Sequence, residues 1–247
     1  MSPLRFRIAP LAALSLACLA GSCHTARRSR DFNLPAIVLW AWERPENLTF
    51  IEPHTTGIGF LAATVVVASN GSIAMRLRTQ RLALTPGAAL LAVVRIESPW
   101  VHAPVSAASL IAGLLDIANQ PGVRGLQIDF DARRSERPFY RTLLESLHAQ
   151  TSTPIGVTAL ASWCEGDRWL DGEPVVEAVP MFFRMGRAES RDMQVRSPVC
   201  RSSIGLSTDE PWPAKRAAGI RRIYVFNPRA WTQREYTRAM QRIQEWK

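Results

Sequence analysis

The chain alternates between short apolar runs and polar segments, and this pattern predicts a series of buried strands. An apolar run of four to eight residues that lacks a helical period is typical of a strand covered on both faces, as in a parallel sheet. Such runs recur from Pro35 almost to the end of the chain. We predict strands over 35–42, 57–62, 90–96, 125–131, 155–160, 179–183, 204–206 and 222–226.

Helical periodicity and turn residues predict the remaining elements. Apolar residues follow a spacing of three and four over 106–119, 135–149 and 232–246, so we expect helices there, and Pro121-Gly122 ends the first of them. Asn70-Gly71 lies between two apolar segments, which is a strong signal of a β-hairpin. We therefore predict an extra hairpin near residues 64–78.

The order of these elements predicts the fold class. Buried strands separated by helices favour parallel pairing with right-handed crossovers, and eight of them fit a closed (β/α)8 barrel of the TIM type with some helices shortened. An open doubly wound sheet is the alternative, but no glycine-rich phosphate loop follows the first strand. No repeat or linker divides residues 35–247, so we expect a single domain.

The first residues have the layout of an export signal. Arg5 and Arg7 precede an apolar run over 8–20, which is short for a membrane span. Small residues then lead into Cys23, as at a bacterial lipoprotein processing site. We predict a signal peptide over 1–22, lipidation at Cys23 and a tether over 23–34, with the protein on the periplasmic side of a bacterial membrane. Cleavage without lipidation stays open, because Ala20 stands where such sites usually have leucine.

Charge and composition narrow the range of partners. The chain has 30 Lys and Arg against 21 Asp and Glu, a net charge of +9. This excess fits an anionic neighbour such as membrane headgroups, acidic glycans or cell-wall polymer. The basic residues are scattered rather than gathered, however, and no nucleic-acid-binding motif is present. We expect no nucleic-acid partner and a monomeric protein.

Two cysteines remain in the predicted domain, Cys164 and Cys200. In an exported chain the simplest interpretation is a disulfide between them. A catalytic thiol is the alternative, but it needs a histidine as base, and His54, His102 and His148 lie at unrelated places in the sequence.

The strand over 125–131 carries charges unusual for a buried strand. Side chains two residues apart leave a strand on the same face, so Gln127, Asp129 and Asp131 form a polar row. Two close carboxylates oppose each other's ionisation, which favours a functional site over a core position. In the alternative interpretation, Asp131 caps the helix that begins near Ser135 and Asp129 pairs with an arginine.

Polar and aromatic residues also follow the other predicted strands. In a barrel of this type the functional site lies where the strands end, at their carboxyl side. A tryptophan ring stacks on a sugar face while carboxylates, amides and guanidinium groups bond to hydroxyls, so these residue types together indicate a glycan site. The candidate substrate-binding residues are Trp42, Glu43, Glu97, Gln127, Trp163, Arg184 and Asn227. Glu43 and Glu97 have an alternative role as ion-pair partners of arginines such as Arg95 and Arg184.

These residues suggest hydrolysis of a glycosidic bond without a cofactor. Such hydrolysis needs one carboxyl group that stays protonated and a charged partner for the oxocarbenium-like state. We assign Asp131 as the acid and Asp129 as the partner that raises its pKa. Two alternatives stay open. One is a non-catalytic glycan-binding or envelope-scaffold lipoprotein, and the other is a metal-dependent hydrolase using Asp129, Asp131 and Glu97, which lacks the usual histidines.

Several segments together resemble a known family. They are Gly125-Leu-Gln-Ile-Asp-Phe-Asp131, Ser135-Glu-Arg-Pro-Phe-Tyr140, Thr158-Ala-Leu-Ala-Ser-Trp-Cys164, 177–181 with 183–186, and Gly205-Leu-Ser-Thr-Asp-Glu-Pro211. They look like the bacterial domain-of-unknown-function 3142 family. The resemblance runs from the first strand nearly to the C-terminus and implies an exported barrel protein, without an assigned activity.

The stretch 125–131 is also similar, more distantly, to the fourth strand of family-18 chitinase-like glycoside hydrolases, in which alternating aspartates lead to a catalytic glutamate. If Asp129 and Asp131 match the aspartates, Arg133 stands at the glutamate position and cannot be an acid. If Asp131 takes the glutamate's place, Gln127 replaces one aspartate. Either alignment departs from the catalytic pattern, which keeps sugar binding without hydrolysis open.

Overall fold

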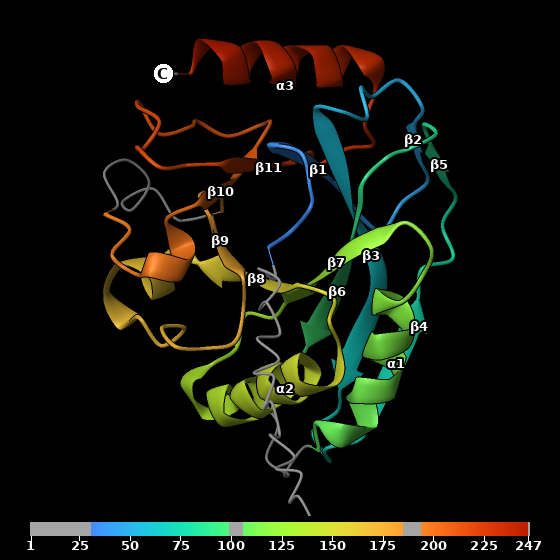
Figure 1. The fold of residues 1–247 in the computed structure, drawn as a ribbon, viewed down its shortest axis with the longest axis vertical. Coiled ribbons are helices and arrows are strands. Elements are labelled where there is room, and N and C mark those ends of the chain that lie inside the picture. The colour runs from blue at the N-terminus through green and yellow to red at the C-terminus, as the bar shows by residue number, and fades with distance from the viewer. Residues whose placement is uncertain (1–30, 99–105, 185–193, 247) are drawn as a thin grey trace, which may run out of the picture.

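The computed structural model describes residues 31–98, 106–184 and 194–246, and its main feature is a closed barrel of parallel strands (Figure 1). In their order around the barrel the strands are β1 (Ile37–Ala41), β11 (Arg222–Phe226), β10 (Ser203–Ser207), β9 (Glu177–Met181), β8 (Ile155–Leu160), β7 (Val123–Asp129), β6 (Leu90–Glu97) and β3 (Thr56–Val67). β3 pairs in parallel with β1 and closes the ring. The predicted TIM-type barrel is therefore confirmed.

The barrel has fewer helices than a full (β/α)8 fold. In the described residues α1 (Ala108–Ala118) follows β6, α2 (Arg137–Gln150) follows β7 and α3 (Gln233–Glu245) follows β11. A π-helical turn, η2 (Trp163–Asp167), follows β8, and the 3-10 turns η1 (Arg134–Glu136) and η3 (Pro198–Cys200) precede α2 and β10. Figure 1 shows α1 and α2 together on one side of the barrel and α3 on the opposite side.

The predicted hairpin is present as β3 and β4 (Ile73–Leu77), which pair antiparallel. Gly71 has φ 83°, a conformation that glycine adopts without strain, and this explains why the turn contains Asn70-Gly71. A short parallel pair formed by β2 (Glu46–Leu48) and β5 (Leu82–Leu84) was not predicted. Three residues are too few for a periodic signal.

Strand β7 begins and ends two residues earlier than predicted. It spans Val123–Asp129, so Asp131 lies in the loop that follows and not in the strand. The apolar row of Leu126, Ile128 and Phe130 is buried against α1 and α2, as expected. The inward row consists of Gly125, Gln127 and Asp129, and it runs along the barrel interior from one end to the other.

Aromatic rings fill the barrel interior, and glycines make room for them. Phe32 and Trp40 are 5% and 3% exposed and belong to one interior cluster. A Cβ atom on Gly59 would lie 2.8 Å from the indole of Trp40, and one on Gly156 would lie 2.8 Å from the ring of Phe32. The two rings thus occupy the volume that inward side chains on β3 and β8 would otherwise fill, which leaves a packed core below the carboxyl ends of the strands.

The N-terminal end of the described chain is part of this packing. Phe32 lies in the segment that we assigned to a tether, and Asp31 forms an ion pair with Arg221 at 3.0 Å. The packed part of the protein therefore includes residues 31 and 32, which lie before residue 35, the predicted start of the domain. The predicted signal peptide and Cys23 lie outside the described residues. None of the helices in the described ranges is long and apolar enough to cross a membrane.

We expect Gly125→Ala to destabilise the protein by about 1–3 kcal/mol, because its Cβ would overlap the ring of Phe32. In a Phe32→Ala background the same change should cost much less, which urea unfolding of the two single variants and the double variant measures. Gly166→Ala is the matched control, since a Cβ atom at that position would have no heavy atom within 4 Å. An equal cost in both backgrounds would contradict the proposed packing.

Candidate active site

A cavity of about 500 Å³ opens where the barrel strands end. Its lining comes from the carboxyl ends of β1, β6, β7, β8, β9 and β11 and from the residues just beyond them. The lining residues that carry charge are Arg44, Arg95, Asp129, Asp131 and Arg184. The interior rings below it close the barrel, so the cavity is a pocket at one mouth and not a channel.

Asp129 lies at the last position of β7 and its side chain lies in this cavity. Thr158, on the neighbouring strand β8, donates a hydrogen bond from its hydroxyl to Oδ1 of Asp129 at 2.6 Å. Burial, helped by the nearby charge of Asp131, raises the pKa of Asp129 from 3.8 to about 6, although the Thr158 hydrogen bond and Arg95 oppose the rise. Asp129 is therefore protonated in part of the protein near pH 6.

Asp131 is more exposed than Asp129 and lies two residues past the end of β7. Burial also raises its pKa, and Arg95 lowers it. Arg95 lies on β6 directly beside Asp129 in the parallel register, and its Nε is 3.0 Å from Glu97 Oε1. One arginine thus stands next to both aspartates while it also pairs with a third carboxylate.

A second, smaller cavity of about 240 Å³ adjoins the first. Arg95, Asp129 and Asp131 line both cavities. The smaller one is completed by polar and charged residues, which include Glu97, Ser98, Arg133 and Glu136. The two aspartates therefore stand at the junction of a larger pocket with aromatic walls and a smaller polar one.

Aromatic rings form much of the wall of the larger cavity. Trp42 is half-buried, packs edge-on against Phe226 at 6.1 Å between ring centroids, and has the Arg95 guanidinium 5.9 Å from its own centroid. Phe226 in turn stacks on Phe183 at 5.6 Å. Trp40 lies at the base of the cavity, where its indole N–H donates to Gln127 Oε1 at 2.9 Å. Trp42 and Phe183 are half-buried and offer ring surfaces beside the charged groups, whereas Trp40 and Phe226 are 3% and 8% exposed and pack behind them.

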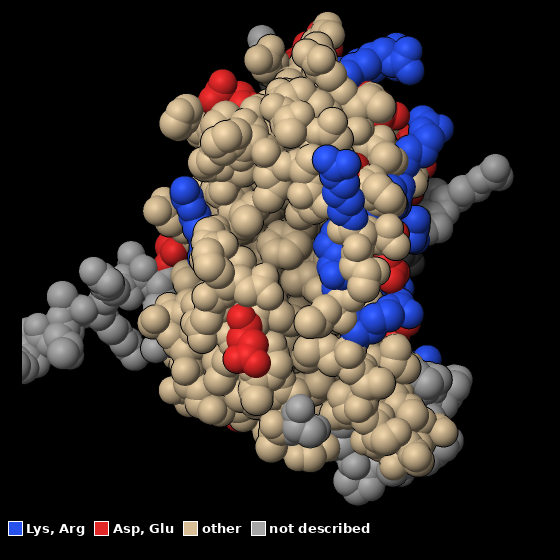
Figure 2. Space-filling view, turned by 90° about the vertical axis from the view of Figure 1, so that its right-hand side faces the viewer, with Lys and Arg blue, Asp and Glu red and all other residues tan. Residues whose placement is uncertain are grey.

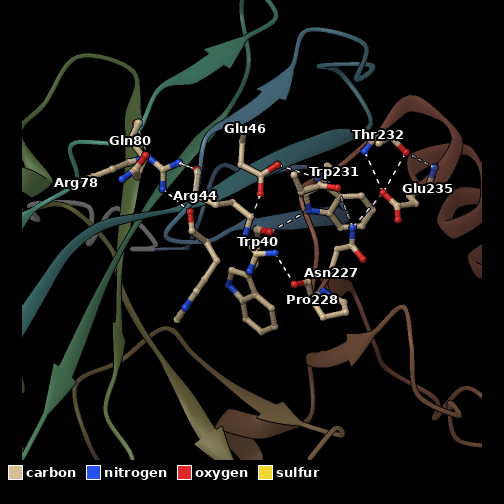
Figure 3. Close-up of polar contacts among 12 residues, drawn as sticks. Trp40, Arg44, Glu46, Arg78, Gln80, Asn227, Pro228, Trp231, Thr232 and Glu235 are labelled. Carbon is tan, nitrogen blue, oxygen red and sulfur yellow. Dashed lines mark hydrogen bonds and ion pairs between the residues drawn. The ribbon is translucent and has the colours of Figure 1, made fainter.

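A buried carboxylate fixes Arg44 at the cavity, as Figure 3 shows. Glu46 Oε2 accepts the backbone N–H of Trp231 at 2.8 Å, and Glu46 Oε1 lies 3.9 Å from Nε of Arg44. Arg44 also donates to the carbonyl oxygen of Pro228 at 2.5 Å, and Arg78 donates to the carbonyl oxygen of Arg44 at the same distance. The loop after β1 is thereby joined to the loop after β11.

Arg184 enters the cavity from the end of β9. Its φ is 56°, a left-handed conformation that is uncommon for a residue with a side chain. Both carboxylate oxygens of Glu210 accept its backbone N–H, at 2.9 and 3.1 Å, and hold it in this conformation. Its guanidinium lies 5.5 Å from the centroid of Phe226.

Four of the residues predicted for the site do line the larger cavity: Trp42, Asp129, Asp131 and Arg184. Glu97 lines the smaller one. Glu43 lies outside both, where it is exposed and pairs with Arg76 at 2.9 Å. The ion-pair role that we considered for Glu43 and Glu97 is present for both, although the partner of Glu43 is Arg76 rather than Arg95 or Arg184.

Three predicted substrate-binding residues are buried and do not line either cavity. Gln127 is fully buried and bonds to Trp40. Trp163 is 3% exposed and packs on Trp169 at 5.0 Å between centroids. Asn227 is 3% exposed, and its side chain accepts a hydrogen bond from Thr208 at 2.7 Å. The position of a residue near a strand end does not show which side of the strand it occupies.

The sequence interpretation missed several residues that line the cavity: Arg44, Arg95, Thr158, Phe183 and Phe226. A signal for two of them existed. Arg95 and Thr158 interrupt otherwise apolar strands, and on a strand of a closed barrel a polar residue near the carboxyl end is best tolerated when it points into the mouth. Phe183 and Phe226 had no such signal, because aromatic residues are equally common in cores.

The disulfide between Cys164 and Cys200 is confirmed, with a Cα–Cα distance of 5.8 Å. It joins the π-helical turn after β8 to the 3-10 turn before β10, and both cysteines are fully buried. On the loop-entropy model, closing this loop stabilises the fold by about 3–4 kcal/mol. It anchors the connection that follows the Thr158 strand. The described ranges contain no group of three or more His, Cys, Asp or Glu that could hold a metal ion.

Comparisons of the chain with protein-family models, curated proteins and solved structures gave no match. The resemblances to the domain-of-unknown-function 3142 family and to family-18 glycoside hydrolases therefore stay predictions. What the site can do must be argued from its own geometry.

We expect the stability of the wild type to fall relative to that of Asp129→Asn as the pH rises. The folded pKa of Asp129, about 6, lies above its value of 3.8 in the unfolded chain, so the folded state holds the proton more tightly and loses stability between pH 3.8 and about 6. The difference between the two proteins should change by up to about 3 kcal/mol across this range. Urea unfolding at pH 4 and pH 7.5 measures it, and an unchanged difference would show that the carboxyl group is not perturbed.

Proposed function

We propose that this protein is an exported barrel that hydrolyses a glycosidic bond, with Asp129 as general acid and Asp131 as its charged partner. These roles exchange the ones that we assigned from the sequence. Asp129 is the more buried of the two and is the carboxyl whose pKa rises to about 6, so it is better suited to hold a proton for donation. The observation that carries the proposal is a buried carboxyl with a raised pKa beside a second carboxyl at the junction of two cavities.

The larger cavity has the features of a sugar site. Trp42 and Phe183, both half-buried, provide ring surfaces on which a pyranose face can stack, and Phe226 packs against both of them. Arg44 and Arg184 supply N–H donors for hydroxyl or carboxylate oxygens. A volume of about 500 Å³ holds a ligand of small-oligosaccharide size.

The position of the two aspartates between the cavities suits cleavage of a bond that spans them. A sugar on the aromatic side and a leaving sugar on the polar side would place the glycosidic oxygen near Asp129. The proton of Asp129 passes to that oxygen as the bond to the anomeric carbon breaks. Asp131 stays ionised beside Arg95, stabilises the positive charge on the sugar, and accepts the proton of the attacking water.

The proposed reaction needs no cofactor, and its partner is a glycan or envelope polysaccharide. Export is supported by the disulfide between Cys164 and Cys200, because such bonds persist in oxidising compartments. Lipidation at Cys23 and a periplasmic location complete the proposal, and the membrane would then be a partner through the N-terminal anchor.

A specific observation also favours a non-catalytic glycan-binding protein as the second candidate. Asp131 lies in the loop after β7 and not on the strand, so it is less firmly positioned than a catalytic group in a barrel usually is. It is also shorter than the glutamate that the family-18 resemblance requires at that place. A binding protein would keep the arginines and the rings and show no turnover.

We expect the protein to release reducing ends from at least one polysaccharide in a panel of envelope and plant glycans. Asp129→Asn and Asp131→Asn should each lower kcat/KM by about 100-fold or more, because each removes a proton-transfer or charge-stabilising group. The wild-type rate should fall as the pH rises through about 6, where Asp129 loses its proton. Asp116→Asn is the control, since Asp116 is an exposed residue of α1 outside both cavities.

Thermal unfolding of each variant separates loss of activity from loss of fold. Glycan binding without turnover in the wild type would contradict the hydrolase and support the second candidate. Equal activity of the wild type and Asp129→Asn would contradict the assignment of the acid.

A further inference from the structure

The larger cavity holds more positive than negative charge. Three arginines and two aspartates line it, and one of the aspartates is partly protonated near pH 6. The chain as a whole carries a net charge of +9. Figure 2 shows Lys and Arg side chains gathered toward one edge of the face drawn there, with some Asp and Glu side chains among them. A site with this balance attracts an anion more strongly than a neutral sugar.

The three arginines differ in how they are neutralised. Arg95 pairs with Glu97 at 3.0 Å, and Arg44 lies 3.9 Å from the buried carboxylate of Glu46. Arg184 forms no ion pair with a carboxylate of the described residues, and Glu210 contacts only its backbone N–H. Within residues 31–98, 106–184 and 194–246, Arg184 is therefore the cavity arginine whose guanidinium has no carboxylate in ion-pair contact.

The backbone conformation of Arg184 is held by specific contacts with another residue. A residue with a side chain adopts a positive φ at a cost of about 1 kcal/mol or more, and here the two hydrogen bonds to Glu210 offset that cost. The guanidinium lies over the ring of Phe226 at the edge of the cavity, where its N–H groups are donors that a ligand can use. A planar fork of donors matches an anionic group with two oxygen atoms.

The rings and the arginine together define the ligand. Phe183 and Phe226 stack on each other at an interplanar angle of 6°, and Arg184 lies against the second of them. A pyranose held against these rings would therefore have the guanidinium of Arg184 at the edge of its ring. Within the described residues that guanidinium has no carboxylate in ion-pair contact. A substituent on the edge of the sugar ring that is an anion would pair with it.

We propose that the cavity takes a glycan whose sugar carries an anionic substituent, and that Arg184 selects it by binding that substituent. This inference rests on the proposed function, because it names the substrate class of the same cavity. The shared chemistry is an oxyanion on a sugar, either the carboxylate of a uronic acid or a sulfate or phosphate ester.

The test uses glycans in matched charged and neutral forms. The pairs are oligogalacturonate with its carboxyl-reduced form, a glucuronic-acid-containing oligosaccharide with its carboxyl-reduced form, a sulfated oligosaccharide with its desulfated form, and a phosphorylated one with its dephosphorylated form. Calorimetry at pH 6 measures the Kd of each. We expect at least one charged form to bind 10-fold or more tightly than its neutral partner, and the pair that shows this distinguishes carboxylate from ester.

Variants of Arg184 test the residue itself. Arg184→Gln should weaken binding of that charged form by about 10- to 100-fold, which is typical of losing hydrogen bonds to a charged group, and should leave the neutral form unaffected. Arg184→Lys should recover part of the loss, because it restores the charge without the fork. Arg234→Gln is the control, since Arg234 is exposed on α3 and outside the cavity. Thermal unfolding checks that each variant is folded.

The outcomes separate this inference from the proposed function. Equal binding and equal cleavage of the charged and neutral forms would overturn the selection of an anion and leave the hydrolase intact. Tight, Arg184-dependent binding of a charged form without turnover would support the selection and overturn the hydrolase. Absence of binding and cleavage for every pair would overturn both.

Discussion

The hydrogen bond between the indole of Trp40 and the side-chain amide of Gln127 marks the level at which the barrel changes from core to site. Below it, Phe32 and Tyr224 fill the interior, and the glycines at 125 and 156 leave the space that Phe32 occupies. Above it, the next inward residue of β7 is Asp129. The aromatic packing closes one end of the barrel, so the polar side chains of the last layer can gather only at the other mouth.

The electrostatics of that mouth follow from this packing. Asp129 sits just above an apolar floor, which disfavours its charge, while Thr158 and Arg95 limit the effect. The resulting pKa of about 6 is useful for proton transfer, because a group with such a pKa is present in both forms near neutral pH. The same floor brings Trp42 and Phe226 close to the charged groups, so the rings and the carboxyl groups that the proposed function uses lie together.

Much of the architecture could be predicted from the sequence, because it depends on local patterns. Apolar runs indicated the barrel strands, Asn70-Gly71 indicated the hairpin, and two cysteines in a chain predicted to be exported indicated the disulfide. The site was harder, because it depends on which side of each strand faces the mouth. Gln127 and Asp129 share one face of β7, yet one lies beneath an indole and the other in a cavity. Gln127 lies at the level of the Trp40 indole, and Asp129 lies beyond it on the side of the cavity.

Long-range contacts explain the other differences. Asn227 follows a strand end, but α3 begins nearby and its Glu235 lies 3.3 Å from the Asn227 amide nitrogen. Trp163 follows another strand end, but η2 turns it toward Trp169 and the core. Arg184 owes its place to Glu210, a residue 26 positions away that no local pattern could connect to it. Residues placed by such partners can be recognised only once the fold is known.

The protonation state of Asp129 is the quantity on which the proposed chemistry depends most. Carbon-13 NMR of the aspartate side-chain carboxyl groups, titrated from pH 3 to pH 9 and assigned with Asp129→Asn, measures it directly. A titration midpoint near 6 for Asp129 is the expected result. A midpoint near the ordinary value of about 3.9 would show that Asp129 is ionised throughout the neutral range and cannot be the acid.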